Sequence, residues 1–380
     1  MRKFAFLVHP LDLDDVVSFE KKSAGKPVAL IKKLLLWLCE RPPFIGSHIT
    51  GINSNTGRKA EGWFINVPLL PEQMKEHPEL AKEKILEAVS FAKELGASIV
   101  GLGGFTSIAT NSGLAIAKEA PLPITTGNSY TVVAAVEGTR KAARLMGIRL
   151  SKAKLAIVGA TGSIGRACSE ILAPQVSEII LVGRRPEVLQ LQADKLKKFT
   201  NVSISMDIKK ALKDADVVIS ASSDANAIID ANDLEPGMVV CDVAQPPDVS
   251  KSVLKERNDI LVFDGGIIKI PGIRIRRKSK FDYDFKLKPD KYAYACMAET
   301  MILCLEGVNE NFDLGSVKVS SAEKISKLAA KHGFKLAGFR SFGEKITRDK
   351  IKEIRRNAAL KSNKKWFYRV RRMLEYSELG

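Results

Sequence analysis

Cysteine and histidine are scarce in this sequence. Its 380 residues include five cysteines and four histidines. The cysteines are odd in number and lack the short intervals of a metal site; they are Cys39, Cys168, Cys241, Cys296 and Cys304. Scattered cysteines of this kind are typical of free thiols in a reducing compartment. We therefore expect neither a disulfide framework nor a metal site.

Long hydrophobic runs are also missing. No apolar run in the sequence reaches the roughly 18 residues that indicate a membrane span. The most apolar early stretch, residues 31–39, is interrupted by lysines and lies too far into the chain for a signal peptide. Hydrophobic residues make up 45% of the sequence, as in globular proteins, and the length allows two domains. We expect a cytoplasmic protein.

Acidic residues are too few to balance the basic ones. The sequence has 60 Lys and Arg against 43 Asp and Glu, a formal net charge of +17. Residues 340–380 hold thirteen basic and five acidic residues. A second concentration, here called the basic cluster, consists of Arg274, Arg276, Arg277, Lys278 and Lys280. Such charge indicates an anionic partner, and for the tail a solvated face that aids solubility is the alternative.

The sequence is organised around a glycine-rich turn within residues 154–165, KLAIVGATGSIG. An apolar strand precedes the turn and a helical pattern follows it, as at the start of a dinucleotide-binding unit. The glycines allow a tight turn, the approach of a pyrophosphate and close packing of helix on strand. The candidate cofactor-binding residues here are Gly159, Ala160, Thr161, Gly162, Ser163, Ile164 and Gly165. The alternative is a glycine turn in an α/β protein that binds no nucleotide.

Two arginines favour NADPH as the cofactor. A second apolar strand is followed by Gly183, Arg184 and Arg185. The ribose of the cofactor should lie at this point, about 20 residues after the turn, where an acidic residue favours NAD and arginine suits a 2′-phosphate. Candidates for contacts with the riboses and the nicotinamide follow later strands; they are Ala221, Ser222, Gly265 and Gly266.

Alternating strand and helix patterns predict the fold class: an α/β protein with a Rossmann-like, doubly wound parallel sheet. The expected strands are Leu155–Val158, Glu178–Val182, Val202–Ser205, Val217–Ser220, Met238–Cys241 and Ile260–Phe263, with helices near Gly165–Leu172, Glu187–Lys198, Ile208–Lys213 and Val249–Lys255. We expect four regions. They are an N-terminal α/β substrate domain (1–148), a Rossmann-like NADP-binding domain (149–289), a helical segment that packs back on the substrate domain (290–338) and a basic C-terminal tail (339–380).

The N-terminal region predicts an α/β domain that binds the substrate. The expected elements are a strand over residues 1–8, a helix over 12–33, a hairpin over 47–70, a helix over 79–95, strands over 98–102 and 123–125, and a helix over 130–146. Small polar residues follow the last two strands, where α/β sheets bind ligands. The candidate substrate residues are Gly103, Gly104, Phe105, Thr126, Gly127 and Asn128. For Asn128 or Ser129, capping of the next helix is the alternative.

Cys296 is the candidate nucleophile. It lies near the start of a helical pattern over residues 291–307, downstream of the basic cluster, where a thiolate could be stabilised. A cysteine in a helix is more commonly a small core residue, and that alternative stays open. Glu299, one turn on, could orient a neighbour or act as a cap. Three histidines are available as bases, but no spacing pairs them with Cys296; they are His9, His48 and His332.

Six short motifs, in their order along the sequence, together resemble those of a known protein family. They are residues 101–107 (GLGGFTS), 125–128 (TTGN), 159–165 (GATGSIG), 265–266 (GG), 295–299 (ACMAE) and 331–334 (KHGF). Together they resemble the long-chain acyl-acyl-carrier-protein reductases, which make fatty aldehydes. The resemblance spans roughly residues 1–337 and includes Thr56–Gly57 and Glu61–Gly62.

The resemblance implies a reduction in two steps. The cysteine that matches Cys296 attacks a thioester carbonyl to form an acyl-enzyme, and hydride from NADPH then yields a fatty aldehyde. It implies a thioester of acyl carrier protein or of CoA as the substrate. Acyl carrier protein is acidic, so the basic cluster is a candidate docking site. The tail after about residue 338 has no counterpart in the compact members of the family, so no role for it is implied.

Two other functions stay open. A dehydrogenase of the shikimate or amino-acid type would reduce a small polar substrate directly, but it would want a lysine and a carboxylate near residues 103–107 or 125–129, where no such pair is evident. A nucleotide-sensing protein could instead bind a membrane or nucleic acid through the tail, where Trp366, Phe367 and Tyr368 lie among basic residues. A peripheral membrane contact of this kind could accompany catalysis, and we expect no nucleic-acid partner for the enzyme.

Overall fold

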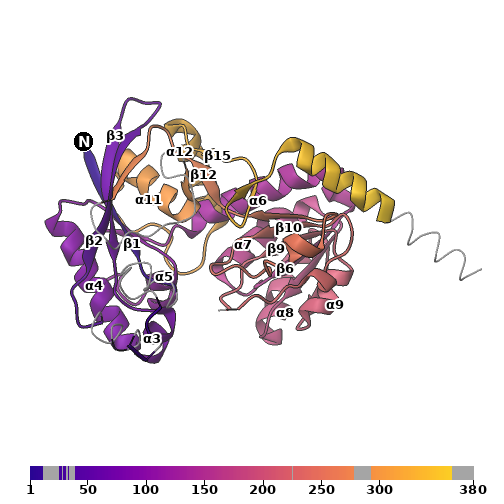
Figure 1. The fold of residues 1–380 in the computed structure, drawn as a ribbon, viewed down its shortest axis with the longest axis horizontal. Coiled ribbons are helices and arrows are strands. Elements are labelled where there is room, and N and C mark those ends of the chain that lie inside the picture. Colours follow the sequence, from indigo (N-terminus) through magenta and orange to yellow (C-terminus); the bar gives the residue numbers. More distant parts are fainter. Residues whose placement is uncertain are drawn as a thin grey trace, which may run out of the picture. The chain divides into compact units, whose positions relative to one another are not determined.

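The structure is a computed structural model that describes residues 1–11, 25–27, 29–30, 33, 39–224, 226–277 and 292–361. The chain forms two compact units (Figure 1). The first consists of residues 1–134 and 266–337, and the second of residues 135–265 and 338–380. Helix α6 (Asn128–Met146) begins in the first unit and ends in the second.

A mixed six-stranded sheet lies at the centre of the first unit, with the order β13-β2-β3-β1-β4-β5. Its strands are β1 (Arg2–Val8), β2 (Phe44–Asn53), β3 (Lys59–Asn66), β4 (Val100–Leu102), β5 (Ile124–Thr125) and β13 (Arg274–Arg277). β3, β1, β4 and β5 are parallel, so their carboxyl ends share one edge. β2 pairs with β3 as the hairpin that the sequence predicts, and β13 extends the sheet beyond β2.

The two faces of this sheet differ because side chains alternate along each strand. On one face, Leu7, Ile65 and Leu102 enter a core beneath α3 (Pro71–Glu76) and α4 (Pro78–Glu94). α4 buries apolar residues at helical spacing, namely Ala81, Ile85, Ala88, Val89 and Ala92. The residues between the core positions of each strand therefore point to the opposite face.

Helix α11 (Ala295–Glu306) covers that opposite face. Nearly all of its residues are buried, which is typical of a helix inside a core. A Cβ on Gly101 of β4 would lie 2.1 Å from Thr300 Oγ1, so the strand and the helix approach closely. Arg2, at the start of β1, donates to the carbonyls of Cys304 and Leu305 at 3.2 Å each. α11 therefore runs antiparallel to β1, and its N-terminus lies toward the carboxyl ends of the parallel strands.

Smaller elements complete the first unit. They are α5 (Phe105–Ala109), α12 (Val319–His332) and an antiparallel sheet of β14 (Tyr292–Tyr294), β12 (Ile267–Lys269) and β15 (Lys335–Leu336). The helix expected over residues 291–307 is too long, because Tyr292–Tyr294 pair with β12 and the helix begins at Ala295. The residues after Gly104 form the short helix α5, which was not predicted from the sequence. The helix expected over residues 12–33 lies almost entirely outside the described residues.

The second unit contains a six-stranded sheet in which all strands are parallel, with the order β11-β10-β9-β6-β7-β8. The strands are β6 (Lys154–Val158), β7 (Glu178–Val182), β8 (Asn201–Ser205), β9 (Val217–Ser220), β10 (Val239–Asp242) and β11 (Leu261–Asp264). The connecting elements are η2 (Leu150–Lys152), α7 (Ser163–Leu172), η3 (Ala173–Gln175), α8 (Pro186–Leu196), α9 (Ile208–Lys213), η4 (Ala231–Asp233) and α10 (Val253–Glu256). This strand order is that of dinucleotide-binding Rossmann folds, so the predicted fold class is confirmed.

Part of the basic tail folds onto the second unit. β16 (Arg340–Ser341) and β17 (Glu344–Lys345) form a small hairpin, and residues 348–361 are helical. The Phe339 ring packs against Phe263 at 4.9 Å between centroids, and Lys361 Nζ lies 3.2 Å from Asp259 Oδ2. The aromatic segment around residues 366–368 lies outside the described residues. Within the described chain, no helix is long and apolar enough to cross a bilayer.

The boundaries of the compact units differ from the domain limits expected from the sequence. The units change at residues 134/135, 265/266 and 337/338, whereas the expected limits were 148/149, 289/290 and 338/339. The difference arises because the first change between the units falls inside the long helix α6, and because residues 267–277 pair with strands of the first unit. The functions assigned to the domains stay predictions.

Candidate active site

Cys296 is the second residue of α11 and is half-buried. It lies against Gly127, which follows β5 and has φ +75°. A Cβ on Gly127 would lie 2.3 Å from both Cα and Cβ of Cys296, so the contact requires glycine. The candidate nucleophile and the candidate substrate loop at residues 126–128 are therefore in direct contact.

Glu299 is completely buried and connects α11 to the start of α6. Thr125 Oγ1 donates to its Oε1 at 2.5 Å, and the Tyr130 amide donates to its Oε2 at 2.7 Å. The carboxylate thereby satisfies one of the amides that a helix N-terminus leaves unpaired. The helix is capped by a residue 169 positions away, and not by Asn128 or Ser129. Burial raises the pKa of Glu299 to about 7.

The rest of the loop after β5 is also held by polar contacts. Thr126 is buried, and its Oγ1 accepts the amide of Asn128 at 3.4 Å. The hydroxyl of Ser129 donates to the carboxylate of Asp313. Asn128 is the first residue of α6 and is only partly buried. This loop is therefore fixed on both sides of Gly127.

The Cys296 thiol is neutral in this state of the protein. Burial raises its pKa to about 12, and the charge of Glu299 adds to the rise, whereas a hydrogen bond from the Met297 amide opposes it. The direction is opposite to the stabilised thiolate that the sequence suggested. The reason is that loss of water around the sulfur outweighs the effect of the helix N-terminus.

His9 follows β1 at the same edge and holds the loop after β4. Its Nε2 accepts the Phe105 amide at 2.8 Å, so the ring proton is on Nδ1, which donates to the Pro10 carbonyl at 2.8 Å. Burial lowers the pKa of His9 to about 4. A Cβ on Gly104, whose φ is +55°, would lie 2.6 Å from Nε2. His9 thus positions the candidate substrate residues Gly103–Phe105, and its acceptor nitrogen is already in use.

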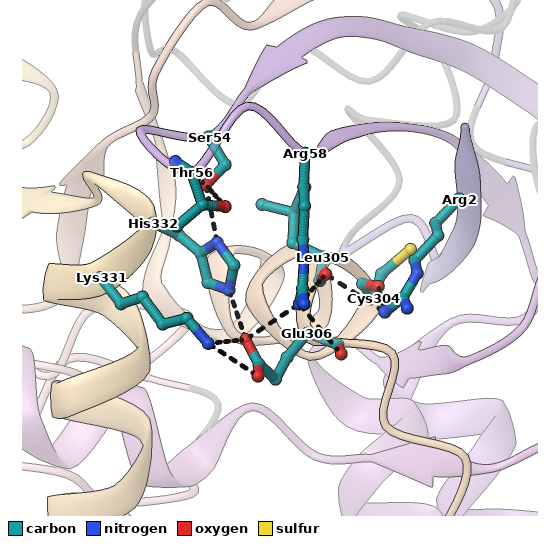
Figure 2. Close-up of polar contacts among 9 residues, drawn as sticks. All are labelled: Arg2, Ser54, Thr56, Arg58, Cys304, Leu305, Glu306, Lys331 and His332. Carbon is teal, nitrogen blue, oxygen red and sulfur yellow. Dashed lines mark hydrogen bonds and ion pairs between the residues drawn. The ribbon is translucent and has the colours of Figure 1, made fainter.

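His332 links three elements at the far end of α11 (Figure 2). Its Nδ1 lies 2.7 Å from Ser54 Oγ in the β2–β3 turn, and its Nε2 lies 2.9 Å from Glu306 Oε2. The ring is fully buried, and burial lowers its pKa. Ser54 Oγ also accepts the Thr56 amide at 3.0 Å. This network joins two motifs far apart in the sequence, residues 56–57 and 331–334, and we assign it a structural role.

The glycine turn of the second unit has the geometry that nucleotide binding needs. Gly159 has φ +76°, and a Cβ there would lie 2.5 Å from the Ala221 carbonyl oxygen. A Cβ on Gly165 would lie 2.4 Å from the Gly159 carbonyl oxygen, so this glycine permits close packing of α7 on β6. Gly162, the N-cap residue of α7, is less crowded, with its nearest neighbour at 3.2 Å. The N-terminus of α7 can therefore receive a phosphate.

Arg184 and Arg185 lie exposed after β7, beside this turn. A Cβ on the preceding Gly183 would lie 3.5 Å from Thr161 of the glycine turn. Within the described chain, neither arginine side chain has a hydrogen-bond or ion-pair partner. Both side chains are thus available to a 2′-phosphate, and the residues present fit a dinucleotide cofactor.

Asp248 was not predicted from the sequence, yet it organises the candidate ribose-binding residues after β9. It is completely buried and accepts hydrogen bonds from Ser220 Oγ, the Ser222 amide and Ser222 Oγ at 2.5, 3.0 and 2.5 Å. These bonds fix Ala221 against Gly159. No pattern in the sequence marks Asp248, because its serine partners lie 26 to 28 positions away.

Gly265 and Gly266, the candidates for contact with the nicotinamide, and part of the basic cluster all have structural roles within the chain. A Cβ on Gly265 would lie 2.8 Å from Cys241 Sγ, so close packing already explains this glycine. Gly266 has φ +91°, and its carbonyl accepts the Ala295 amide at 2.7 Å. Of the basic cluster, Arg274–Arg277 form β13, while Lys278 and Lys280 lie outside the described residues. A contact of Gly265 and Gly266 with the nicotinamide stays a prediction.

Comparisons with known proteins match both the second unit and most of the chain. Residues 140–264 match the shikimate / quinate 5-dehydrogenase family, which classes the second unit with nucleotide-binding domains of oxidoreductases. The aminotransferase PigE of Serratia sp. is 30% identical over 372 residues, which cover 93% of this chain but 42% of PigE. Among solved structures, quinate dehydrogenase from Corynebacterium glutamicum is 12% identical with a TM-score of 0.38, covering 86% of this chain and 98% of that one.

A further relative is matched over most of its length. Long-chain acyl-[acyl-carrier-protein] reductase of Synechococcus elongatus is 31% identical over 313 residues, which cover 77% of this chain and 87% of the reductase. On this evidence the chain belongs to the long-chain acyl-[acyl-carrier-protein] reductase family.

Proposed function

We propose that this protein is an NADPH-dependent reductase that converts a long-chain acyl thioester to a fatty aldehyde through an acyl-enzyme on Cys296. The observation that carries the proposal is the placement of Cys296 at the N-terminus of α11, against the glycine of the loop after β5. A reactive group at this edge of an α/β sheet lies where such folds bind ligands. Family membership supports the same chemistry.

In the first step, the sulfur of Cys296 bonds to the thioester carbonyl carbon, and the bond from that carbon to the carrier sulfur breaks. The proton that leaves the Cys296 thiol is accepted by the departing carrier thiolate. Because burial raises the pKa of the thiol to about 12, this proton is lost only as the substrate reacts. The N-terminus of α11 favours the developing negative charge, and Gly127 fixes the position of the sulfur.

In the second step, the acyl group is reduced and released. Gly159–Gly165 would hold the pyrophosphate of NADPH, and Arg184 with Arg185 would hold its 2′-phosphate. When bound, this cofactor supplies a hydride to the acyl carbon. Protonation of the oxygen gives a thiohemiacetal on Cys296, and cleavage of its carbon–sulfur bond releases the aldehyde and restores the thiol.

The carrier of the acyl group would be acyl carrier protein or CoA. Both carry negative charge, and β13 places Arg274 of the basic cluster on the edge strand of the first sheet. Complementary charge at such a surface raises the rate of encounter. A rate of acylation that falls steeply with salt, and falls less steeply for Arg274→Ala, would support docking at this strand.

The match at residues 140–264 favours a second candidate, direct reduction of a small polar substrate as in shikimate or quinate dehydrogenases. That reaction transfers hydride to the substrate carbon without a covalent intermediate. It therefore needs no nucleophilic cysteine, and the two candidates differ in one measurable species, the acyl-enzyme.

Intact-protein mass after incubation with a long-chain acyl thioester, without NADPH, distinguishes the two. We expect an acyl-sized mass gain in the wild type and none in Cys296→Ala, with aldehyde released when NADPH is added. Cys304→Ala is the matched control, because Cys304 is buried in the same helix at its other end. No adduct with either acyl carrier protein or CoA thioesters would refute the proposal and favour the small-substrate dehydrogenase.

A further inference from the structure

Asn66 is the last residue of β3 and is buried. The residue is 1% exposed, and neither the oxygen nor the nitrogen of its side-chain amide has a hydrogen-bond partner among the described residues. Most buried polar groups in proteins are paired, since an unpaired one costs about 1–3 kcal/mol. A buried asparagine with both polar atoms unpaired therefore requires an explanation other than packing.

The position of Asn66 relates it to the candidate active site. Ile65 enters the core beneath α3 and α4, so Asn66, like Phe64 before it, points to the opposite face of the sheet, which α11 covers. The ring of Phe64 packs against Phe6 on that face, at 6.3 Å between centroids. Asn66 thus lies on the same face of the sheet as the helix that carries Cys296.

Asn66 also lies at the same edge as Cys296. It pairs in register with Val8, the last residue of β1, and β4 and β5 end at the same edge. The N-terminus of α11 lies toward this edge, because its C-terminus contacts Arg2 at the start of β1. With neighbouring strands about 4.8 Å apart, β3 lies about 10 Å from β4 across β1. A ligand extending from Cys296 along the strand ends would reach Asn66.

We propose that Asn66 is a substrate-binding residue that recognises an amide group of the pantetheine arm of the carrier. The proposal rests on the proposed function, in which the substrate is an acyl thioester. Such a substrate offers few polar groups, since the acyl chain beyond the thioester is apolar. The remaining polar groups near the sulfur are the thioester carbonyl and the amides of the arm.

The donor and acceptor atoms of the Asn66 side chain indicate which of these groups it binds. The thioester carbonyl only accepts hydrogen bonds, so it would pair the amide nitrogen of Asn66 and leave the oxygen unpaired. A secondary amide has both an N–H and a carbonyl, and it can pair both atoms at once. Because Asn66 is buried in the ligand-free protein, binding displaces the atoms that cover it, and the arm replaces them with two hydrogen bonds.

The test compares two thioesters of decanoic acid, one on pantetheine and one on ethanethiol, which has no amide. Acylation of Cys296 is followed by intact mass for the wild type, Asn66→Leu and the control Asn201→Leu on the exposed end of β8. We expect Asn66→Leu to slow acylation by the pantetheine thioester about 10- to 100-fold, the loss of two hydrogen bonds. Acylation by the ethanethiol ester should change less than about twofold. An equal effect on both esters would overturn the proposal.

A binding measurement separates this proposal from the proposed function. Pantetheine alone should raise the melting temperature of the wild type and of Cys296→Ala, but not that of Asn66→Leu. If this pattern holds and no thioester acylates the wild type, the proposed function fails and the Asn66 site stands. If the wild type is acylated but pantetheine stabilises every variant equally or none, the Asn66 proposal fails alone. Asn66→Ala, which adds no bulk, provides the same comparison if Asn66→Leu does not fold.

Discussion

Replacing Gly127 with alanine tests how tightly Cys296 is held. Gly127 has φ +75°, and its new Cβ would lie 2.3 Å from Cα and Cβ of Cys296. Ordinary contacts between such atoms are about 3.5–4.0 Å, so the loop or the helix must move by more than about 1 Å. Neither partner is a flexible side-chain end, because the contact involves the backbone of α11. The substitution should therefore displace the thiol.

Gly127→Ala carries a conformational cost and an overpacking cost, and a comparison with Gly57→Ala separates the two. An L-residue in the left-handed region costs about 1–2 kcal/mol, and overpacking of a core contact costs about 1–3 kcal/mol. Gly57 has nearly the same conformation, φ +79°, but a Cβ there would have no neighbour within 4 Å. Gly57→Ala should therefore be destabilised only by the cost of the left-handed conformation. We expect Gly127→Ala to be less stable than Gly57→Ala by about 1–3 kcal/mol.

Urea unfolding and acyl transfer to Cys296 measure the two effects. A displacement of about 1 Å can lower a rate about 100-fold, so Gly127→Ala should acylate about 100 times more slowly than the wild type. Gly57→Ala should acylate at the rate of the wild type. Equal unfolding free energies for the two variants would show that Gly127 does not press on α11, and the reasoning about the site would be wrong.

Three further predictions concern charges and buried polar groups. Because burial raises the pKa of Glu299 to about 7, the folded state keeps a proton that the unfolded state loses above about pH 4.5. The free energy of unfolding should therefore fall by about 2.5 kcal/mol from pH 5 to pH 8. Urea unfolding should show a smaller fall for Glu299→Gln, which cannot titrate at this position. Replacing Arg184 and Arg185 with alanine should weaken NADPH binding about 10-fold or more and leave NADH binding unchanged in a fluorescence titration. His332→Ala should lower the free energy of unfolding by about 2–4 kcal/mol in thermal or urea unfolding, because it removes a completely buried ring that bridges Ser54 and Glu306.

The second unit could be predicted well from the sequence, since its signals are local. Its strands are runs of four or five residues, apolar except for β8, and the first three are each followed by a turn and a helix, α7, α8 and α9. The glycines that the turn needs are adjacent in sequence, and the structure finds Gly159 and Gly165 in the crowded positions that the motif predicts. Where a contact connects residues a few positions apart, pattern and propensity suffice.

Several contacts in the first unit could not be predicted from the sequence, because they join residues far apart in it. The cap of α6 comes from Glu299, and the partner of His332 comes from the β2–β3 turn, more than 160 and 270 positions away in sequence. Spacing cannot reveal such pairs, because the sheet and α11 bring them together only after folding. The pKa of Cys296 was misjudged for the same reason: the charge of the basic cluster is visible in sequence, but the burial of the thiol is not.

The two ends of α11 differ in their contacts and in the roles that these contacts allow. At its C-terminus, Arg2 and Arg58 donate to the last carbonyls, at 3.2–3.3 Å, and Lys331 pairs with Glu306 at 2.9 Å (Figure 2). Cations at this end satisfy carbonyls that the helix leaves unpaired and complement its dipole, each contributing about 0.3–1 kcal/mol. These contacts fix the helix along the sheet from the end remote from Cys296. The N-terminal end can then remain half-buried and carry the thiol, held in position by Gly127 and by the carboxylate of Glu299 one turn further on.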